Sequence, residues 1–90
     1  MARAIVDPAE LRRFALSLKH FTGELHSQSA TVQGMFSALA DTWRDQEHEK
    51  FAQEFTQTVQ VLSHFLGTAE THIPFLLRKA ERIEEYLQQR

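Results

Sequence analysis

Apolar residues recur every three or four positions through the first half of the chain. They fall at Leu11, Phe14, Leu18, Phe21 and Leu25 and, after the polar Gln28, at Val32, Met35 and Leu39. This spacing is typical of an amphipathic helix with a single apolar stripe. Asp7 and Pro8 suit a helix start, because aspartate caps free backbone N–H groups and proline fits the first turn. The pattern predicts a first helix over about residues 8–40.

The second half of the chain repeats this rhythm. Phe51 and Phe55 lead into a stripe made of Val59, Leu62, Leu66, Ala69, Ile73, Leu76, Ala80, Ile83 and Leu87. It predicts a second helix over about residues 45–88. Pro74 lies inside that range, and a proline within a helix removes a hydrogen bond and costs about 3 kcal/mol. Because the rhythm passes Pro74 without a phase change, we expect one long helix kinked near Pro74. A three-helix bundle, with a break between Gly67 and Pro74, is the alternative.

The apolar face of the second half is wider than one helix–helix contact requires. Phe65, Phe75 and Tyr86 form a row beside the main stripe, and His72 lies at its edge. Two antiparallel helices cover only one seam, so a wider face favours a second neighbour. We therefore predict an all-α antiparallel helical hairpin that pairs into a four-helix-bundle dimer. Phe65, His72, Phe75 and Tyr86 are the residues expected at the interface.

The composition narrows the class of protein further. Ninety residues with three glycines, two prolines and no cysteine indicate one helical domain, residues 1–90, without disulfides or thiolate metal sites. A net charge of −2 provides no basic surface for nucleic acid. No apolar run approaches the roughly 20 residues that span a bilayer, and the amino terminus lacks the apolar core of a signal peptide. We expect a soluble protein that binds neither nucleic acid nor the membrane interior.

Catalytic and metal-binding chemistry find little support in the sequence. Asp45, His48 and Glu49 lie within one helical turn and could share a cation. However, metal sites in helical bundles typically use Glu-x-x-His pairs, and the sequence contains none. A charged, solvated first turn of the second helix is the better interpretation. No phosphate-binding loop or nucleophile motif occurs either. We predict no metal, no cofactor and no enzymatic activity.

The stretch "LADTWRDQEHEKFAQEF", residues 39–55, interrupts the apolar rhythm and contains the only tryptophan. Asp45 precedes the second helix and can cap it. Trp43 is large and flat, which suits a side chain that seals the end of a bundle where the chain turns. Phe51, eight residues later, would face the same end of the core. The stretch predicts a helix–helix corner in which Trp43 is chiefly structural.

This corner resembles the turn of a known family. A Trp-x-Gly turn between two long helices, with a phenylalanine eight residues after the tryptophan, marks the small WXG (ESAT-like) proteins. Trp43, Arg44, Asp45 and Phe51 match that pattern apart from the glycine. The resemblance implies a dimeric hairpin that is a substrate or partner of type VII secretion. Its partner would be a second copy, a related hairpin or a larger effector, and Trp43 could also contact a secretion component. A cytoplasmic structural or adaptor bundle unrelated to secretion is the alternative.

Three positions depart from the family pattern. Asp45 replaces the glycine, and Glu47 replaces a residue that is often small. Family export signals place an acid four residues after a tyrosine, whereas Arg90 lies four residues after Tyr86 here. A cytoplasmic location is therefore expected, or secretion without a cleavable signal peptide in which a partner carries the tail signal.

Overall fold

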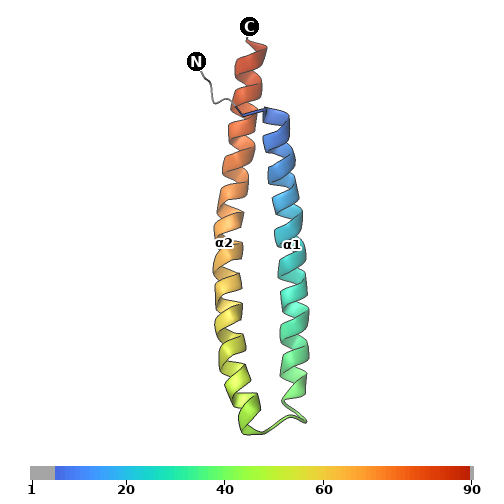
Figure 1. The fold of residues 1–90 in the computed structure, drawn as a ribbon. Coiled ribbons are helices and arrows are strands. Elements are labelled where there is room, and N and C mark those ends of the chain that lie inside the picture. Colours follow the sequence, from blue (N-terminus) through green and yellow to red (C-terminus); the bar gives the residue numbers. More distant parts are fainter. Residues whose placement is uncertain (1–5, 90) are drawn as a thin grey trace.

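Two long helices lie side by side and run in opposite directions (Figure 1). The computed structural model describes residues 6–89, in which α1 spans Pro8–Leu39 and α2 spans Gln46–Gln88. The hairpin measures 68 × 23 × 15 Å. Its radius of gyration is 20.1 Å, against about 12 Å for a compact domain of this length. The predicted all-α hairpin is confirmed, and it is a rod with little interior.

Both helices begin at the aspartates that the sequence suggested. The Asp7 carboxylate accepts a hydrogen bond from the Ala9 N–H at 2.9 Å, and Pro8 occupies the first turn. The Asp45 carboxylate accepts one from the His48 N–H at 3.0 Å. Each side chain satisfies a donor that has no partner inside its helix. The helix bounds consequently agree with the predicted ones to within one residue.

Pro74 does not divide the second helix. The helix α2 continues through it from Gln46 to Gln88, so the three-helix alternative is wrong. Pro74 and Glu70 are both exposed. The Glu70 carbonyl, which loses its helical donor to the proline, therefore belongs to a part of the helix that water reaches. The residue before it, Ile73, is buried, and this burial compensates for the missing hydrogen bond.

The contact between the helices uses most of the stripe of α2 but a smaller part of the stripe of α1. Leu66, Ala69, Ile73 and Ala80 of α2 are buried. On α1 the buried residues are Ala15 and Thr22, and these small side chains allow a close approach of the helices. The Thr22 hydroxyl donates to the Lys19 carbonyl at 3.0 Å, so its burial leaves no unpaired group. Five members of the predicted α1 stripe remain exposed: Phe14, Phe21, Val32, Met35 and Leu39.

An ion pair joins the helices near the open end of the hairpin. Arg12 Nη2 lies 2.6 Å from Glu84 Oε1, and Arg12 Nε donates to Glu84 Oε2 at 3.3 Å. The hydrogen bond and the negative charge of Glu84 raise the pKa of Arg12. The pair is partly exposed, so it chiefly orients the two helices rather than holding them together.

Candidate partner-binding face and turn

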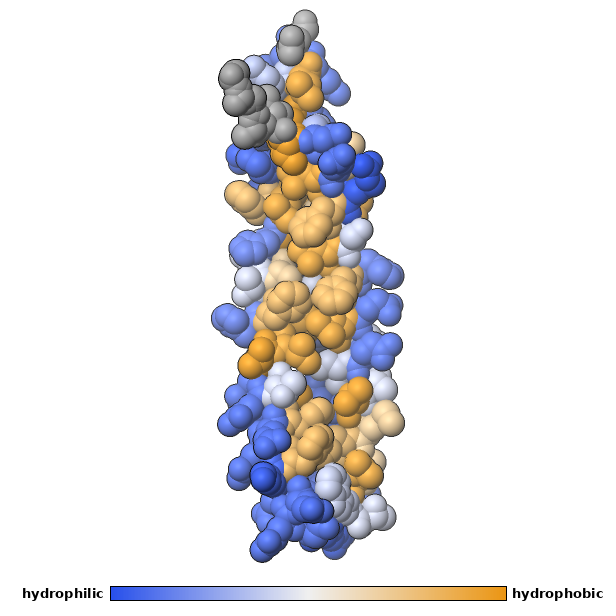
Figure 2. All heavy atoms as spheres, viewed as in Figure 1, coloured by the Kyte–Doolittle hydropathy of each residue, from blue (hydrophilic) through white to orange (hydrophobic). Residues whose placement is uncertain are grey.

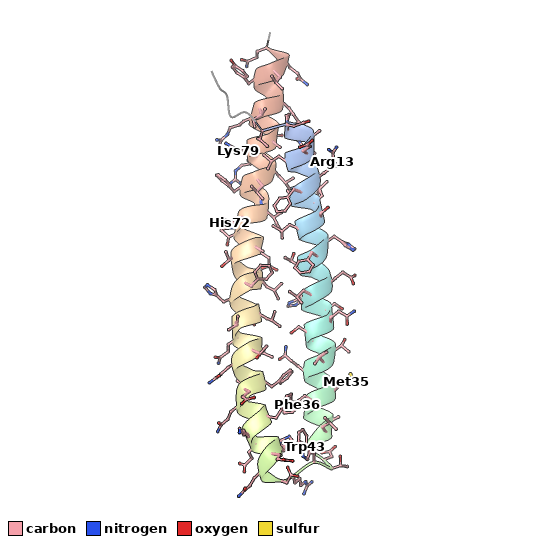
Figure 3. The ribbon with its side chains drawn as sticks, in the orientation of Figure 1. Arg13, Met35, Phe36, Trp43, His72 and Lys79 are labelled. Atoms are coloured by element: carbon pink, nitrogen blue, oxygen red, sulfur yellow. The ribbon has the colours of Figure 1, made fainter. Side chains whose placement is uncertain are left out.

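Trp43 lies at the closed end of the hairpin, as Figure 3 shows. Its indole is half-buried, with ring centroids 5.0 Å from His48 and 6.1 Å from Phe51. The backbone N–H of Trp43 donates to the backbone carbonyl of Leu39, the last residue of α1, at 2.8 Å. The structure thus places Trp43, in the turn, together with Phe51, in α2.

Phe36 completes this cluster, and the sequence interpretation did not include it. Its ring stacks on His48 at 5.3 Å with an interplanar angle of 11°, and it contacts Phe51 at 5.5 Å and Phe55 at 4.9 Å. The stripe assigned to the first helix passed through Met35 instead. A signal was present: Phe36 lies seven residues after Ser29, and Ser29 lies seven after Thr22 and fourteen after Ala15. Ala15, Thr22, Ser29 and Phe36 thus form a second row on α1, and this row faces α2.

Asp45 and Arg44 make the turn without a glycine. Asp45 has φ −107° and ψ −176°, an extended conformation open to any residue. No residue between 6 and 89 has a positive φ. Arg44 is exposed, and its Nε donates to the Ala40 carbonyl at 3.3 Å, where a cation also complements the end of the α1 dipole. The chain therefore needs no left-handed residue where the family has its glycine, and Asp45 acts there as a cap.

Two of the three residues considered as cation ligands, Asp45 and His48, have other roles in the structure. The Asp45 carboxylate caps α2, while the His48 imidazole is packed between Phe36 and Trp43. His48 Nε2 is buried and has no hydrogen-bond partner within the described chain. Across residues 6–89, no three histidine, aspartate or glutamate side chains are grouped so that they could hold a metal ion.

The four residues expected at an interface are all exposed. The exposed fractions are 42% for Phe65, 53% for Phe75 and 64% for Tyr86, and His72 is also exposed. Phe65 packs edge to face against Phe21 of α1, with ring centroids 6.3 Å apart. The exposed surface therefore extends across both helices.

Two rows with seven-residue spacing make up most of this surface, which we call the exposed apolar face, and the exposed Phe75 lies outside both rows. On α1 the row is Phe14, Phe21, Gln28 and Met35, and on α2 it is Phe51, Thr58, Phe65, His72, Lys79 and Tyr86. Figure 2 shows apolar side chains along one side of the rod, flanked by polar ones and interrupted by a polar band. Seven-residue spacing keeps a row on one side of a supercoiled helix, which is the pattern of a helix–helix contact surface.

The face is hollowed toward the turn. An open groove of about 570 Å³ is lined by Val32, Met35, Phe36, Ala38, Leu39, Phe51 and Phe55. We call it the turn groove. A second hollow, of about 490 Å³, has mixed polarity and is lined by Lys19, Thr22, Gly23, His26, Glu70, Ile73, Pro74 and Leu77. Of these two hollows, the turn groove is the one lined by apolar residues alone, so it fits another apolar side chain better than a polar ligand.

Fold and turn together define a small helical hairpin whose helices are joined by a tryptophan corner. The family model WXG100, "Proteins of 100 residues with WXG", matches residues 4–86. The chain belongs to this family and is a small helical protein related to type VII secretion.

Solved structures agree with that assignment. The chain is similar to the secreted protein EsxB from Bacillus anthracis strain Sterne. One EsxB structure is 30% identical, with a TM-score of 0.75 over 93% of this chain and 97% of that one. Another is 29% identical, with a TM-score of 0.79 over 94% and 96%. No curated protein matches. Neither α1 nor α2, as described, combines the length and apolar character needed to cross a bilayer.

Proposed function

We propose that the chain is a non-enzymatic protein–protein interaction module of type VII secretion that acts as a dimer. Its proposed role is that of a substrate, or of an escort for a larger effector. The exposed apolar face carries this proposal. Large side chains such as Phe14, Phe21 and Phe65 are about half exposed on one side of the rod. An apolar strip of that length is uncommon on a protein that works alone.

The accessible surface supports the same conclusion. The chain exposes 7169 Å², whereas a compact monomer of its mass exposes about 5,400 Å². The excess is larger than the roughly 800 Å² that each partner buries in a standard interface. Covering the exposed apolar face with a second hairpin would give the rod the interior that one copy lacks. The second hairpin is proposed to be another copy, with a related hairpin or effector domain as the other candidate.

The chemistry of the grooves favours binding over catalysis. The turn groove is lined by apolar side chains that offer no acid or base. We propose accordingly that Trp43, Arg44, Asp45 and Phe51 chiefly stabilise the turn and, as a second role, contact a partner. Phe65, His72, Phe75 and Tyr86 are proposed to meet the partner.

We propose further that the chain leaves the cytoplasm without a cleavable signal peptide. The similar EsxB structures are of a secreted protein. Arg90, the residue that departs from the family tail signal, lies outside the described residues, so this proposal rests on the family and the fold. A signal on the partner would then direct export of the pair.

Export can be tested in the organism that encodes the chain. The epitope-tagged chain is followed by immunoblot in culture medium, with and without the ATPase of the type VII system. A cytoplasmic enzyme serves as the control for lysis. We expect the chain in the medium only when the ATPase is present. Retention in both strains would contradict the secretion role and favour a cytoplasmic adaptor bundle.

A further inference from the structure

We propose that the hollow of mixed polarity between α1 and α2 is a second docking site, which binds a tryptophan side chain of a partner protein. This hollow of about 490 Å³ includes Gly23 and Pro74, and we call it the rear hollow. The indole ring packs on its apolar residues, and the indole N–H donates to the backbone carbonyl of Glu70. The site lies within one copy of the chain, so the inference does not depend on the proposed dimer.

The rear hollow and the exposed apolar face lie on opposite sides of the contact between the helices. Thr22 of α1 is buried in that contact, with Phe21 before it and Gly23 after it. Neighbouring residues of a helix point about 100° apart, so Phe21 turns to one side of the contact and Gly23 to the other. On α2, Pro74 likewise follows the buried Ile73 and lines the same hollow as Gly23. A hairpin that covers the exposed apolar face would therefore leave the rear hollow open.

Two features of the sequence create the rear hollow. Gly23 has no side chain, and a Cβ added to it would meet no other atom within 4 Å. Pro74 has no backbone N–H, so the carbonyl of Glu70, one turn earlier, has no helical donor. Glu70 and Pro74 both line the hollow, which places this carbonyl at its wall. The site thus combines open space with a hydrogen-bond acceptor that the helix does not use.

The lining of the rear hollow matches an indole. Ile73, Leu77 and the ring of Pro74 form an apolar surface against which a flat ring can pack. An indole N–H is a donor only, so it complements the free carbonyl of Glu70. The Lys19 ammonium lines the same hollow and can lie over the face of the ring. This cation–π contact is strongest with tryptophan, which favours an indole over a phenol.

The charges around the rear hollow favour an uncharged occupant. Lys19 and Glu70 have opposite charges and come from opposite helices, and His26 lies beside them. Within residues 6–89 these side chains form no ion pair with one another, and none of them belongs to a group that could hold a metal ion. A small ion of either sign would meet a side chain of like charge, whereas a neutral indole would not.

The shape of the rear hollow favours a protein over a free small molecule. Sites for small molecules bury about 70–90% of the ligand, whereas this hollow is open to solvent. A neighbouring depression of about 390 Å³ on α1 shares Lys19 and Gly23 with it. The open side and this depression leave room for the backbone that carries the tryptophan.

Binding of an isolated indole side chain tests the site directly. The probe is N-acetyl-tryptophanamide, which is uncharged and has an amide group on each side of the residue. It is titrated into the nitrogen-15-labelled chain, and shifts of the backbone amide signals in NMR spectra locate it. We expect the shifts to concentrate in residues 19–26 and 70–77, with a dissociation constant on the order of 1 mM for a single side chain. N-acetyl-1-methyltryptophanamide lacks the indole N–H and should bind about fivefold more weakly, which is the usual effect of one hydrogen bond.

Two variants separate the role of the carbonyl from that of the space. Pro74→Ala restores a backbone N–H that bonds to the carbonyl of Glu70, so it should abolish the preference for the unmethylated probe. Gly23→Leu fills the rear hollow and should remove the binding of both probes. Gly34→Leu is the matched change at the other glycine of α1, which also has open surroundings but lies outside the hollow, and it should leave both affinities unchanged.

Each contrary result has a distinct meaning. Shifts confined to the exposed apolar face or the turn groove, or no shifts at all, would overturn the site. Equal binding of the two probes by the wild-type chain, or a preference that survives in Pro74→Ala, would overturn the role of the Glu70 carbonyl. Binding that is unchanged in Gly23→Leu would overturn the location. The proposed dimer is unaffected by any of these results, because its test is the mass of the chain in solution.

Discussion

Trp43 and His48 pack edge to face with their ring centroids 5.0 Å apart, on either side of the cap that begins α2. Phe36 of α1 covers the other side of the imidazole, with the two rings nearly parallel. The histidine therefore links the turn to the last part of α1. The closed end of the hairpin is held by an aromatic cluster rather than by a tight glycine turn.

Trp43→Ala should lower the free energy of unfolding by about 2 kcal/mol, below the 3–5 kcal/mol of a fully buried aromatic because the indole is only half-buried. Trp43→Phe keeps much of the contact with His48 and Phe51, so it should cost less than half of that. Urea denaturation followed by circular dichroism measures both. A Trp43→Ala chain as stable as the wild type would show that the indole serves recognition alone.

The polar imidazole of His48 packs against the rings of Phe36 and Trp43. Its Nε2 is buried without a hydrogen-bond partner, and an unpaired buried group is unfavourable. His48→Leu keeps an apolar contact with Phe36 and removes the unpaired nitrogen. We expect a change of no more than about 1 kcal/mol, in the stabilising direction.

His48→Ala is the comparison, because it removes the contact as well and should destabilise the chain by about 1–2 kcal/mol. Thermal melts of the two variants distinguish the effects. A loss in His48→Leu as large as that in His48→Ala would mean that the nitrogen itself stabilises the folded chain.

Asp45 should behave as a helix cap. Asp45→Ala removes the acceptor for the His48 N–H and should cost about 1 kcal/mol, whereas Asp45→Gly should cost only a few tenths. Asp45→Asn preserves an acceptor and should be close to the wild type. Chemical denaturation of the three variants gives the ranking. A gain in stability with glycine would indicate backbone strain at a residue whose φ and ψ show none.

The sequence was sufficient to predict both helices, the corner and the proximity of Trp43 and Phe51, because capping residues and apolar periodicity act locally. It did not predict which side of α1 meets α2. The apolar surface of α1 is broad enough for two contacts, and its rotation is set by close packing at Ala15 and Thr22. Phe36 thus became an inner residue, and Met35 became an outer one. Periodicity alone does not encode that choice.

In the proposed dimer, a second copy covers the exposed apolar face. Sedimentation equilibrium of the purified chain at micromolar concentration tests it most directly. We expect a species of twice 10.4 kDa. We also expect Phe65→Asp, which places a charge in the face, to shift the equilibrium to monomer. Leu16→Asp, at an exposed apolar residue beside Lys19 and Glu24, should remain dimeric. A wild-type chain that sediments as a monomer would contradict the proposed dimer. A Phe65→Asp chain that stays as dimeric as Leu16→Asp would contradict the proposal that the exposed apolar face forms its interface.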